Sequence, residues 1–196
     1  MTGANPTPPY RTSPPDLIVR QLRWSDFEPL RDLYYLLYEE RKVQRDIGLT
    51  LFRTPPSNFE EVSWFTGLYR AVQSGDAVAA VAERNGHVVG SCVVRRVGLS
   101  ESSEAGHVGL LGILVHRDHR GAGAGRALLA HALAQCRAKF EIVRLSVFSV
   151  NVRARKLYEE FGFRYIGTVP RHVLRDGEYF DEDLMVLDLG PTDENR

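Results

Sequence analysis

A glycine-rich segment between two apolar segments constrains the fold of this chain most strongly. Residues 110–115 read Leu-Leu-Gly-Ile-Leu-Val, residues 120–126 read Arg-Gly-Ala-Gly-Ala-Gly-Arg, and an alanine- and leucine-rich segment follows. This order predicts a strand, a tight turn and the start of a helix. Backbone N–H groups without bulky side chains, together with the positive end of a helix dipole, favour binding of a phosphate or pyrophosphate. We call residues 120–126 the glycine loop.

The spacing of the glycines argues against two well-known phosphate-binding loops. A P-loop requires Gly-x-x-x-x-Gly-Lys-Ser/Thr, and neither a lysine nor a hydroxyl residue follows Gly125. A dinucleotide-binding fingerprint counted from Gly121 and Gly123 places Arg126 where a small residue is needed. A nicotinamide-dependent oxidoreductase is further disfavoured because no run of parallel βαβ units follows.

Two segments together resemble the signatures of one enzyme family. Arg120-x-x-Gly123-x-Gly125 resembles the Gln/Arg-x-x-Gly-x-Gly/Ala signature of the GCN5-related N-acetyltransferase (GNAT) superfamily. Residues 151–163, NVRARKLYEEFGF, resemble its second signature, Asn-x-x-Ala-x-x-Leu-Tyr-x-x-x-Gly-Phe. The glycine pattern alone would occur by chance in roughly one chain in five of this length. Two signatures in the family's order make coincidence an inadequate explanation, and the resemblance extends over about residues 17–189.

The composition is that of an ordinary globular protein with no general affinity for polyanions. The 196 residues are 43% hydrophobic and 26% charged, with a formal net charge of zero, and this length can bury one sizeable core. Balanced charge disfavours nucleic acid and acidic membranes as partners. Cys92 and Cys136 fall in a predicted strand and a predicted helix, which favours buried thiols in a reducing compartment. They do not resemble a metal-binding pair, and we expect no metal.

The two ends of the chain are predicted to be tails around a single domain. Residues 1–15 are rich in Pro, Thr and Ser and lack an apolar core, which is typical of a disordered tail rather than of a signal peptide or membrane span. We therefore expect a disordered tail at 1–15, one domain at 16–190 and a C-terminal tail at 191–196. Because neither a signal peptide nor a membrane span is predicted, we expect the protein to be cytoplasmic. The sequence is also compatible with a homodimer.

Periodicity and turn signals predict the order of helices and strands. Strands are expected at 17–23, 77–84, 87–95, 107–115, 142–148 and 184–189, and helices at 25–41, 57–75, 123–139 and 152–161. Ser25-x-x-Glu28 and Ser57-x-x-Glu60 predict capping boxes, and Asn85-Gly86 predicts a tight type I′ hairpin. In the second helix, Phe59, Val62, Phe65, Tyr69 and Val72 are expected on one apolar side.

These elements predict an α/β (α+β) fold with one sheet. Asp176-Gly177 predicts a final hairpin, in addition to the hairpin at Asn85-Gly86. Two strands linked by a helix lie between these hairpins in the sequence. We expect a single mixed, mostly antiparallel sheet of about seven strands flanked by helices. The family resemblance implies the same arrangement, that of an acyl-CoA N-acyltransferase.

The resemblance implies that acetyl-coenzyme A (acetyl-CoA) binds along the strand, the glycine loop and the last predicted helix. The cofactor-binding residues that it implies are Ile113, Leu114, Val115, Arg120, Gly121, Ala122, Gly123, Ala124, Gly125, Arg126, Asn151 and Lys156. A strand that splays from its neighbour leaves backbone groups for the amides of pantetheine. Asn151 could also cap the helix that follows it. Arg155 and Lys156 could reach the adenosine phosphates, or could be ordinary solvated charges.

The resemblance also implies attack of a neutral amine on the thioester carbonyl. Tyr158 matches the motif position whose phenol faces the cofactor sulfur, and a phenol with a pKa near 10 keeps its proton at neutral pH. We assign Tyr158 as general acid, with core packing beside Leu157 and Phe161 as the alternative. Candidates for the general base are Glu83, Glu104, His107 and His116, with deprotonation through water as the alternative.

The acceptor is left open by the sequence. The resemblance allows a protein α-amino group, a lysine or a small amine, held between the connection at 42–56 and the C-terminal hairpin. Four acidic residues of that hairpin would favour a cationic acceptor, although they could equally be solvated surface charges: Glu178, Asp181, Glu182 and Asp183. The alternative function is a non-catalytic acyl-CoA sensor or interaction module with the same fold.

Overall fold

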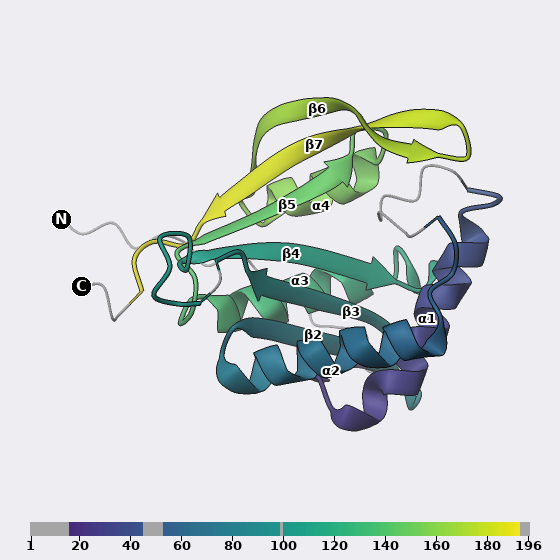
Figure 1. Ribbon diagram of the computed structural model, residues 1–196, viewed down its shortest axis with the longest axis horizontal. Helices are drawn as coiled ribbons and strands as arrows, with labels where there is room; N and C mark the ends of the chain where they lie inside the picture. Colours follow the sequence, from purple (N-terminus) through teal and green to yellow (C-terminus); the bar gives the residue numbers. More distant parts are fainter. Residues whose placement is uncertain (1–15, 45–52, 99, 193–196) are drawn as a thin grey trace.

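A computed structural model describes residues 16–44, 53–98 and 100–192. Its centre is a seven-stranded sheet with the order β1-β2-β3-β4-β5-β7-β6 (Figure 1). The strands are β1 (Leu17–Gln21), β2 (Ala77–Arg84), β3 (His87–Arg96), β4 (Val108–Val115), β5 (Ile142–Phe148), β6 (Arg164–Arg175) and β7 (Glu178–Asp188). All neighbouring pairs are antiparallel except β4 and β5. The predicted single mixed, mostly antiparallel sheet is confirmed.

Helices lie on both faces of the sheet. The helical elements are η1 (Trp24–Asp26), α1 (Phe27–Glu40), α2 (Asn58–Ser74), η2 (Arg117–His119), α3 (Ala124–Cys136) and α4 (Val152–Glu160). Figure 1 shows α1 and α2 in front of the sheet and α3 and α4 behind it. Alternate residues of β2 serve the two faces, because side chains of a strand alternate in direction. Val78, Ala80 and Ala82 pack in the cluster with α3, and Ala77, Ala79 and Val81 pack in the cluster with α2.

The sheet opens at its one parallel pair. The pairing between β4 and β5 covers only Val108–Leu110 against Ile142–Arg144. Beyond this point β4 stays paired with β3 as far as Val115, whereas β5 stays paired with β7 as far as Phe148. Figure 1 shows the two strands diverging towards their C-terminal ends. The backbone of β4 that faces β5 is therefore released from strand pairing after Leu110, as the family resemblance implied.

Several local signals form the predicted turns and caps. At the start of α2, Ser57 Oγ accepts a hydrogen bond from the Glu60 N–H at 3.3 Å, and the Glu60 carboxylate accepts from the Ser57 N–H at 2.7 Å. Gly75 ends α2 in the left-handed conformation, with φ of 88°. Asn85 and Gly86 have φ of 51° and 78°, which fits the predicted type I′ turn.

The start of α1 differs from the prediction. The capping box at Ser25 and Glu28 does not form, and residues 24–26 make a 3-10 turn before α1 begins at Phe27. The carboxylate of Asp26 accepts a hydrogen bond from the Arg23 N–H at 2.7 Å and pairs with Arg20 through two contacts of 2.8 Å. An ion pair with the preceding strand therefore decides where the helix starts, and β1 ends at Gln21 rather than at residue 23.

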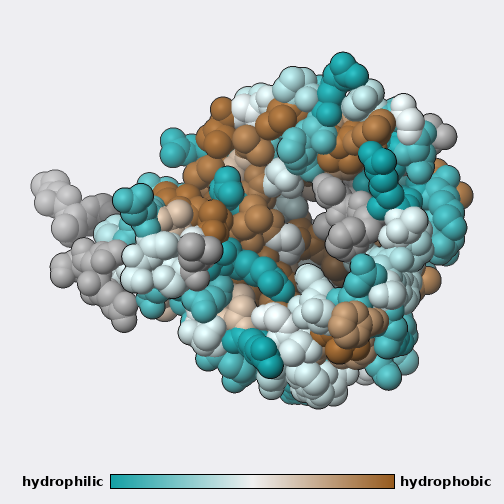
Figure 2. Space-filling model, in the orientation of Figure 1, coloured by the Kyte–Doolittle hydropathy of each residue, from teal (hydrophilic) through white to brown (hydrophobic). Residues whose placement is uncertain are grey.

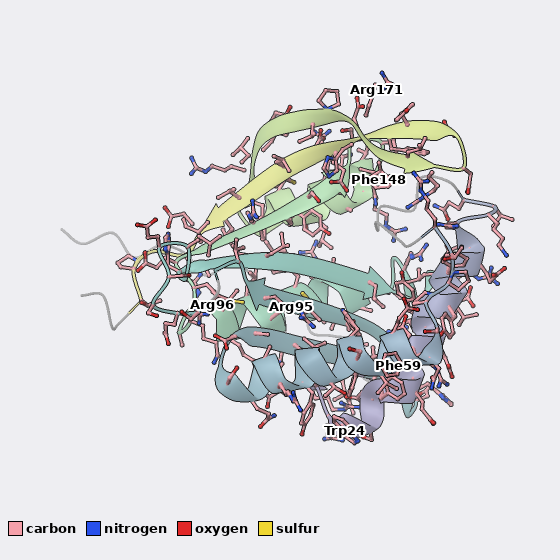
Figure 3. All side chains as sticks on the ribbon, viewed as in Figure 1. Trp24, Phe59, Arg95, Arg96, Phe148 and Arg171 are labelled. Carbon is pink, nitrogen blue, oxygen red and sulfur yellow. The ribbon has the colours of Figure 1, made fainter. Side chains whose placement is uncertain are left out.

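The packing side of α2 also differs from the prediction. Phe59, which is labelled in Figure 3, is 80% exposed. Val62 is 40% exposed, whereas Phe65 is buried. The rings of Trp24 and Phe27 pack edge-on against Phe65, with centroids 5.6 and 5.4 Å apart. The side of α2 that faces the core is therefore formed by Phe65, Leu68 and Val72, and Phe59 and Val62 near the start of the helix lie outside it.

The final hairpin is longer than predicted. Asp176 and Gly177 form its turn with φ of 49° and 85°, and β6 and β7 extend it on both sides. Irregular pairing between Val169 and Val173, with Arg171 at φ of 53°, interrupts the alternation that would have marked a long strand.

Other sequence predictions concern the thiols, the membrane and the tails. Cys92 and Cys136 are buried free thiols, as predicted. Within the described ranges, no helix is long and apolar enough to cross a membrane. The predicted tail at 1–15, residues 45–52 of the predicted connection and residues 193–196 lie outside the described residues.

Candidate functional site

A cleft of about 890 Å³ lies where β4 and β5 diverge, and we call it the central cleft. Figure 2 shows the face of the molecule hollowed near its centre, with hydrophobic residues beside the hollow. The cleft is lined by the ends of β4 and β5, by the glycine loop, by α4 and by the end of α1. Its lining includes Leu37, Gln44, Ile113, Leu114, Val115, Arg120, Gly121, Gly123, Gly125, Arg126, Val147, Asn151, Arg153, Lys156, Leu157 and Tyr158. The structure thus brings most of the predicted cofactor-binding residues together with Tyr158.

The glycine loop has the backbone of an anion-binding turn. Gly121 and Gly123 have φ of 77° and 89°, a region that residues with a Cβ rarely adopt. Gly123 is the N-cap of α3, and within the described chain no side chain caps this helix end. The first N–H groups of α3 are therefore available to an anion. Ala124 is fully buried beneath the loop, and Ala122 is half-buried, with its carbonyl 3.4 Å from Arg84 Nη2.

Arg120 makes its contacts within the protein. Its Nη1 and Nη2 atoms donate to the two carboxylate oxygens of Glu40 at 2.6 and 2.7 Å. Its Nε atom donates to the carbonyl oxygen of Val115 at 2.9 Å. The side chain that was predicted to bind the cofactor therefore fixes the start of the glycine loop, although it still lines the cleft.

Positive side chains surround the loop, including one that the sequence analysis missed. Arg153 lies beside Gly121, since a Cβ at position 121 would come 2.5 Å from its Nη2 atom. Lys156 is exposed and lines the central cleft, and Arg126 lines it while pairing with Glu160. Arg153 and Lys156 are three residues apart on α4 and thus share a side of the helix, a spacing that could have identified Arg153.

Two other residues of the second motif have clear structural roles. Asn151 caps α4, because its Oδ1 atom accepts a hydrogen bond from the Ala154 N–H at 3.1 Å, and it also lines the cleft. Arg155 turns away from the cleft towards β7, where Nη1 lies 2.8 Å from Asp183 Oδ2. Arg155 is therefore not placed near the glycine loop, in contrast to Lys156.

Tyr158 both packs in the core and lines the central cleft. The residue is 6% exposed, and its ring centroid lies 5.8 Å from that of Phe163. Burial, and to a smaller extent the nearby Cys92, raises the pKa of the Tyr158 phenol above its usual value of 10. The phenol therefore keeps its proton throughout the neutral and mildly alkaline range.

The candidate bases do not lie with Tyr158. Glu83 accepts a hydrogen bond from Arg20 Nε at 3.0 Å and, with His116, lines a second cleft of about 630 Å³ between α1 and the β2-β3 hairpin. Glu104 and His107 precede β4, whereas the glycine loop follows it. The eight-residue strand separates these two ends by about 23 Å. None of the four candidates lines the central cleft.

The acidic residues of the hairpin are not four free surface charges. Glu182 and Asp183 are 5% and 2% exposed, and Glu182 lies 3.4 Å from His172. Asp183 accepts hydrogen bonds from Ser149 and Thr168, each at 2.7 Å. Burial acts to raise the pKa of Asp183, but these hydrogen bonds and the charge of Arg155 outweigh it and lower the pKa. At most Glu178 and Asp181 are exposed, and Asp181 accepts from the Arg171 N–H at 2.6 Å.

The fold and the central cleft together define the class of protein to which this chain belongs. A mixed sheet of this order, opened at its parallel pair beside a glycine loop, is that of the acyl-CoA N-acyltransferases. The Acetyltransferase (GNAT) family matches residues 19–163, and the chain therefore belongs to this family. In the described part of the chain, no group of three or more His, Cys, Asp or Glu side chains is arranged to hold a metal ion.

Individual proteins resemble the chain to different extents. It is 25% identical over 169 residues to the L-amino acid N-acetyltransferase AaaT of Escherichia coli (strain K12), an alignment that spans 85% of this chain and 94% of the relative. It is 51% identical over 53 residues to N-alpha-acetyltransferase 40 of Saccharomyces cerevisiae, spanning 23% of this chain and 19% of that protein. The structure of yncA from Salmonella typhimurium, solved with its cofactor acetyl-CoA, superimposes with a TM-score of 0.74 at 20% identity, over 89% of this chain and 95% of that one.

Proposed function

We propose that this protein is an N-acetyltransferase that moves the acetyl group of acetyl-CoA to a primary amine by direct attack in a ternary complex. The observation that carries the proposal is that the glycine loop, the released edge of β4 and the Tyr158 side chain all line one cleft. Membership of the acetyltransferase family supports the reaction class.

The residues of the central cleft fit coenzyme A. Its pyrophosphate would lie over the N–H groups of residues 121–126, with Arg153 and Lys156 supplying positive charge from α4. The amides of pantetheine would pair with the backbone of Ile113 and Val115 where β4 has left β5. A volume of about 890 Å³ lies within the range usual for ligand sites.

Tyr158 is proposed to supply the proton that the reaction needs. Acetyl-CoA provides an acetyl group activated as a thioester. The amine nitrogen forms a bond to the carbonyl carbon and gives up one proton to water, the carbon–sulfur bond breaks, and the sulfur takes the Tyr158 proton, which solvent then replaces. A backbone N–H of β4 would stabilise negative charge on the carbonyl oxygen. The apolar surroundings that raise the Tyr158 pKa would also raise that of the thiol, so the two remain close enough for transfer.

Removal of the amine's proton is proposed to occur through water. The four candidate bases do not line the central cleft, and Glu160, the acidic side chain that lines it among the described residues, pairs with Arg126. The attacking species is then the fraction of amine that is already neutral. This fraction rises with pH towards the pKa of the amine.

An α-amino group is the acceptor that we favour. One relative is named an L-amino acid N-acetyltransferase and the other an N-alpha-acetyltransferase, and an α-amino acceptor is compatible with both names. The acceptor would enter between the end of α1, where Leu37 and Gln44 line the cleft, and the C-terminal hairpin. Burial of Glu182 and Asp183 weakens the case for a strongly cationic acceptor, and leaves any such preference to Glu178 and Asp181.

A screen of amines tests the function. The protein is mixed with acetyl-CoA and a library of amino acids, polyamines, lysine peptides and peptides with free N-termini, and release of free thiol is followed. We expect release that depends on both protein and amine, with acetylation of nitrogen confirmed by mass spectrometry. An O-acetyl product would refute the amine assignment. Binding of coenzyme A without release across the library would favour the non-catalytic sensor.

A further inference from the structure

Glu40, the last residue of α1, forms an ion pair with Arg120 of the glycine loop. The carboxylate of Glu40 is 7% exposed and lies at the C-terminal end of α1, where the helix dipole disfavours negative charge. Its two oxygens accept hydrogen bonds from Nη1 and Nη2 of Arg120 at 2.6 and 2.7 Å. This parallel, two-bond geometry is the strongest arrangement available to an arginine and a carboxylate.

The same guanidinium joins three parts of the central cleft. While Nη1 and Nη2 hold Glu40, Nε donates to the carbonyl oxygen of Val115, the last residue of β4, at 2.9 Å. Arg120 is also the first residue of the glycine loop, immediately before Gly121 with its positive φ. The end of α1, the end of β4 and the start of the loop are therefore fixed to one planar group.

The end of α1 is in turn tied to the chain that leads into α2. The Tyr38 hydroxyl and Arg41 Nη2 both donate to the Arg53 carbonyl, at 2.5 and 2.9 Å. The Tyr35 hydroxyl donates to the Pro56 carbonyl at 2.9 Å. The side chain of Leu37 lines the central cleft from the same stretch of helix. A shift of this stretch would therefore alter the part of the cleft wall that Leu37 forms.

We propose that Glu40 and Arg120 form a positioning pair that couples occupancy of the glycine loop to the order of the last turns of α1. An anion bound to the N–H groups of the loop fixes the backbone next to Arg120, and the ion pair transmits that constraint to Glu40. Coupling of this kind is reciprocal, so an ordered α1 also favours the bound loop. The proposal rests on the proposed function for its ligand, coenzyme A.

Hydrogen exchange of α1 amides with and without coenzyme A tests the coupling. Glu40→Gln keeps the shape of the side chain but removes its charge. Glu39→Gln is the matched control, because Glu39 is the preceding residue of α1 and its exposed carboxylate pairs with Lys42 at 2.5 Å. In the wild type and Glu39→Gln, saturating coenzyme A should slow exchange at residues 37–44. In Glu40→Gln this slowing should be lost, and coenzyme A should bind about five- to tenfold more weakly.

Each outcome has a definite meaning. Equal slowing of exchange in Glu40→Gln and the wild type would overturn the coupling while leaving the proposed function intact. Failure of the wild type to bind coenzyme A by calorimetry would overturn both. If Glu40→Gln does not fold, Arg120→Lys carries the test, because a lysine keeps the charge but cannot hold Glu40 and the Val115 carbonyl together. Undiminished slowing in folded Arg120→Lys would then overturn the coupling.

Discussion

The guanidinium of Arg153 on α4 lies against Gly121 of the glycine loop, so that a Cβ atom at position 121 would come 2.5 Å from Nη2. The absence of a side chain at 121 thus lets a positive charge from another element reach the loop. This contact joins the two sequence motifs of the family in space, and it places Arg153 where a phosphate on the loop would need a counter-charge.

Arg153→Ala is expected to weaken coenzyme A binding about tenfold, which corresponds to one charge-assisted contact of about 1.4 kcal/mol. Calorimetry at low and high salt measures the affinity, and the difference from the wild type should shrink as salt screens the charge. Arg117→Ala is the control, because the Arg117 side chain is 64% exposed and pairs with Asp118 at 3.5 Å. Equal weakening in both variants would remove Arg153 from the site.

Gly123→Val is expected to abolish measurable coenzyme A binding, because a branched side chain would occupy the place where phosphate oxygens approach the backbone. Gly86→Val is the matched control, since Gly86 also has a positive φ but has no atom within 4 Å of an added Cβ. Each variant should lose about 1–2 kcal/mol of stability from backbone strain. Unchanged affinity in a folded Gly123→Val protein would place the pyrophosphate elsewhere.

The pH profile of kcat/KM should rise towards the pKa of the amine and then level off. The amine must be neutral to attack, and the raised pKa of Tyr158 keeps the phenol protonated beyond the usual tyrosine value of 10. Initial rates between pH 6 and about 10, corrected for spontaneous thioester hydrolysis, measure the profile. If kcat/KM instead fell at high pH with a midpoint below about pH 9, the group that must be protonated would have a pKa too low to be that of Tyr158.

Asp183→Asn should destabilise the fold by about 1–3 kcal/mol, because Ser149, Thr168 and Arg155 lose the charge that they surround. The pKa of Asp183 is lowered in the folded protein, so its contribution is present above the unfolded value near 3.9 and is lost as pH falls through the folded value. Urea unfolding at pH 7 and pH 3 measures this. Asp118→Asn, at a 68% exposed side chain, should change little at either pH. An equal loss at both pH values would contradict the ionic role of Asp183.

The sequence predicted features that depend on a few neighbouring residues. The turn at Asn85-Gly86, the cap at Ser57 and the end of α2 at Gly75 formed as predicted because each is decided within four residues. The glycine loop and Tyr158 could also be located, since the two motifs fix them relative to a strand and a helix. The predicted order of strands and helices then placed them around one cleft.

Features that depend on distant partners were missed. Glu40 and Arg120 are 80 residues apart, and no local pattern joins them. Asp26 replaces Ser25 at the start of α1 because Arg20 of β1 reaches it, and Arg155 turns from the predicted phosphates to Asp183 of β7. Much of β6 was not predicted, because the bulge around Arg171 interrupts the alternation of its residues. This strand is defined by its pairing with β7, which is also a distant partner.

The most direct test of the account is the rate of amine-dependent thiol release from acetyl-CoA by the wild type and by Tyr158→Phe. Tyr158→Phe keeps the ring that packs against Phe163 and removes the hydroxyl group that carries the proton. With the best acceptor from the amine screen, we predict a kcat lower by one to three orders of magnitude, within reach of general-acid effects of about 10² to 10⁴, and nearly unchanged coenzyme A affinity. Tyr165→Phe, at an exposed tyrosine, should retain full activity. Full activity in Tyr158→Phe would contradict the proposed mechanism and leave Tyr158 as a core residue.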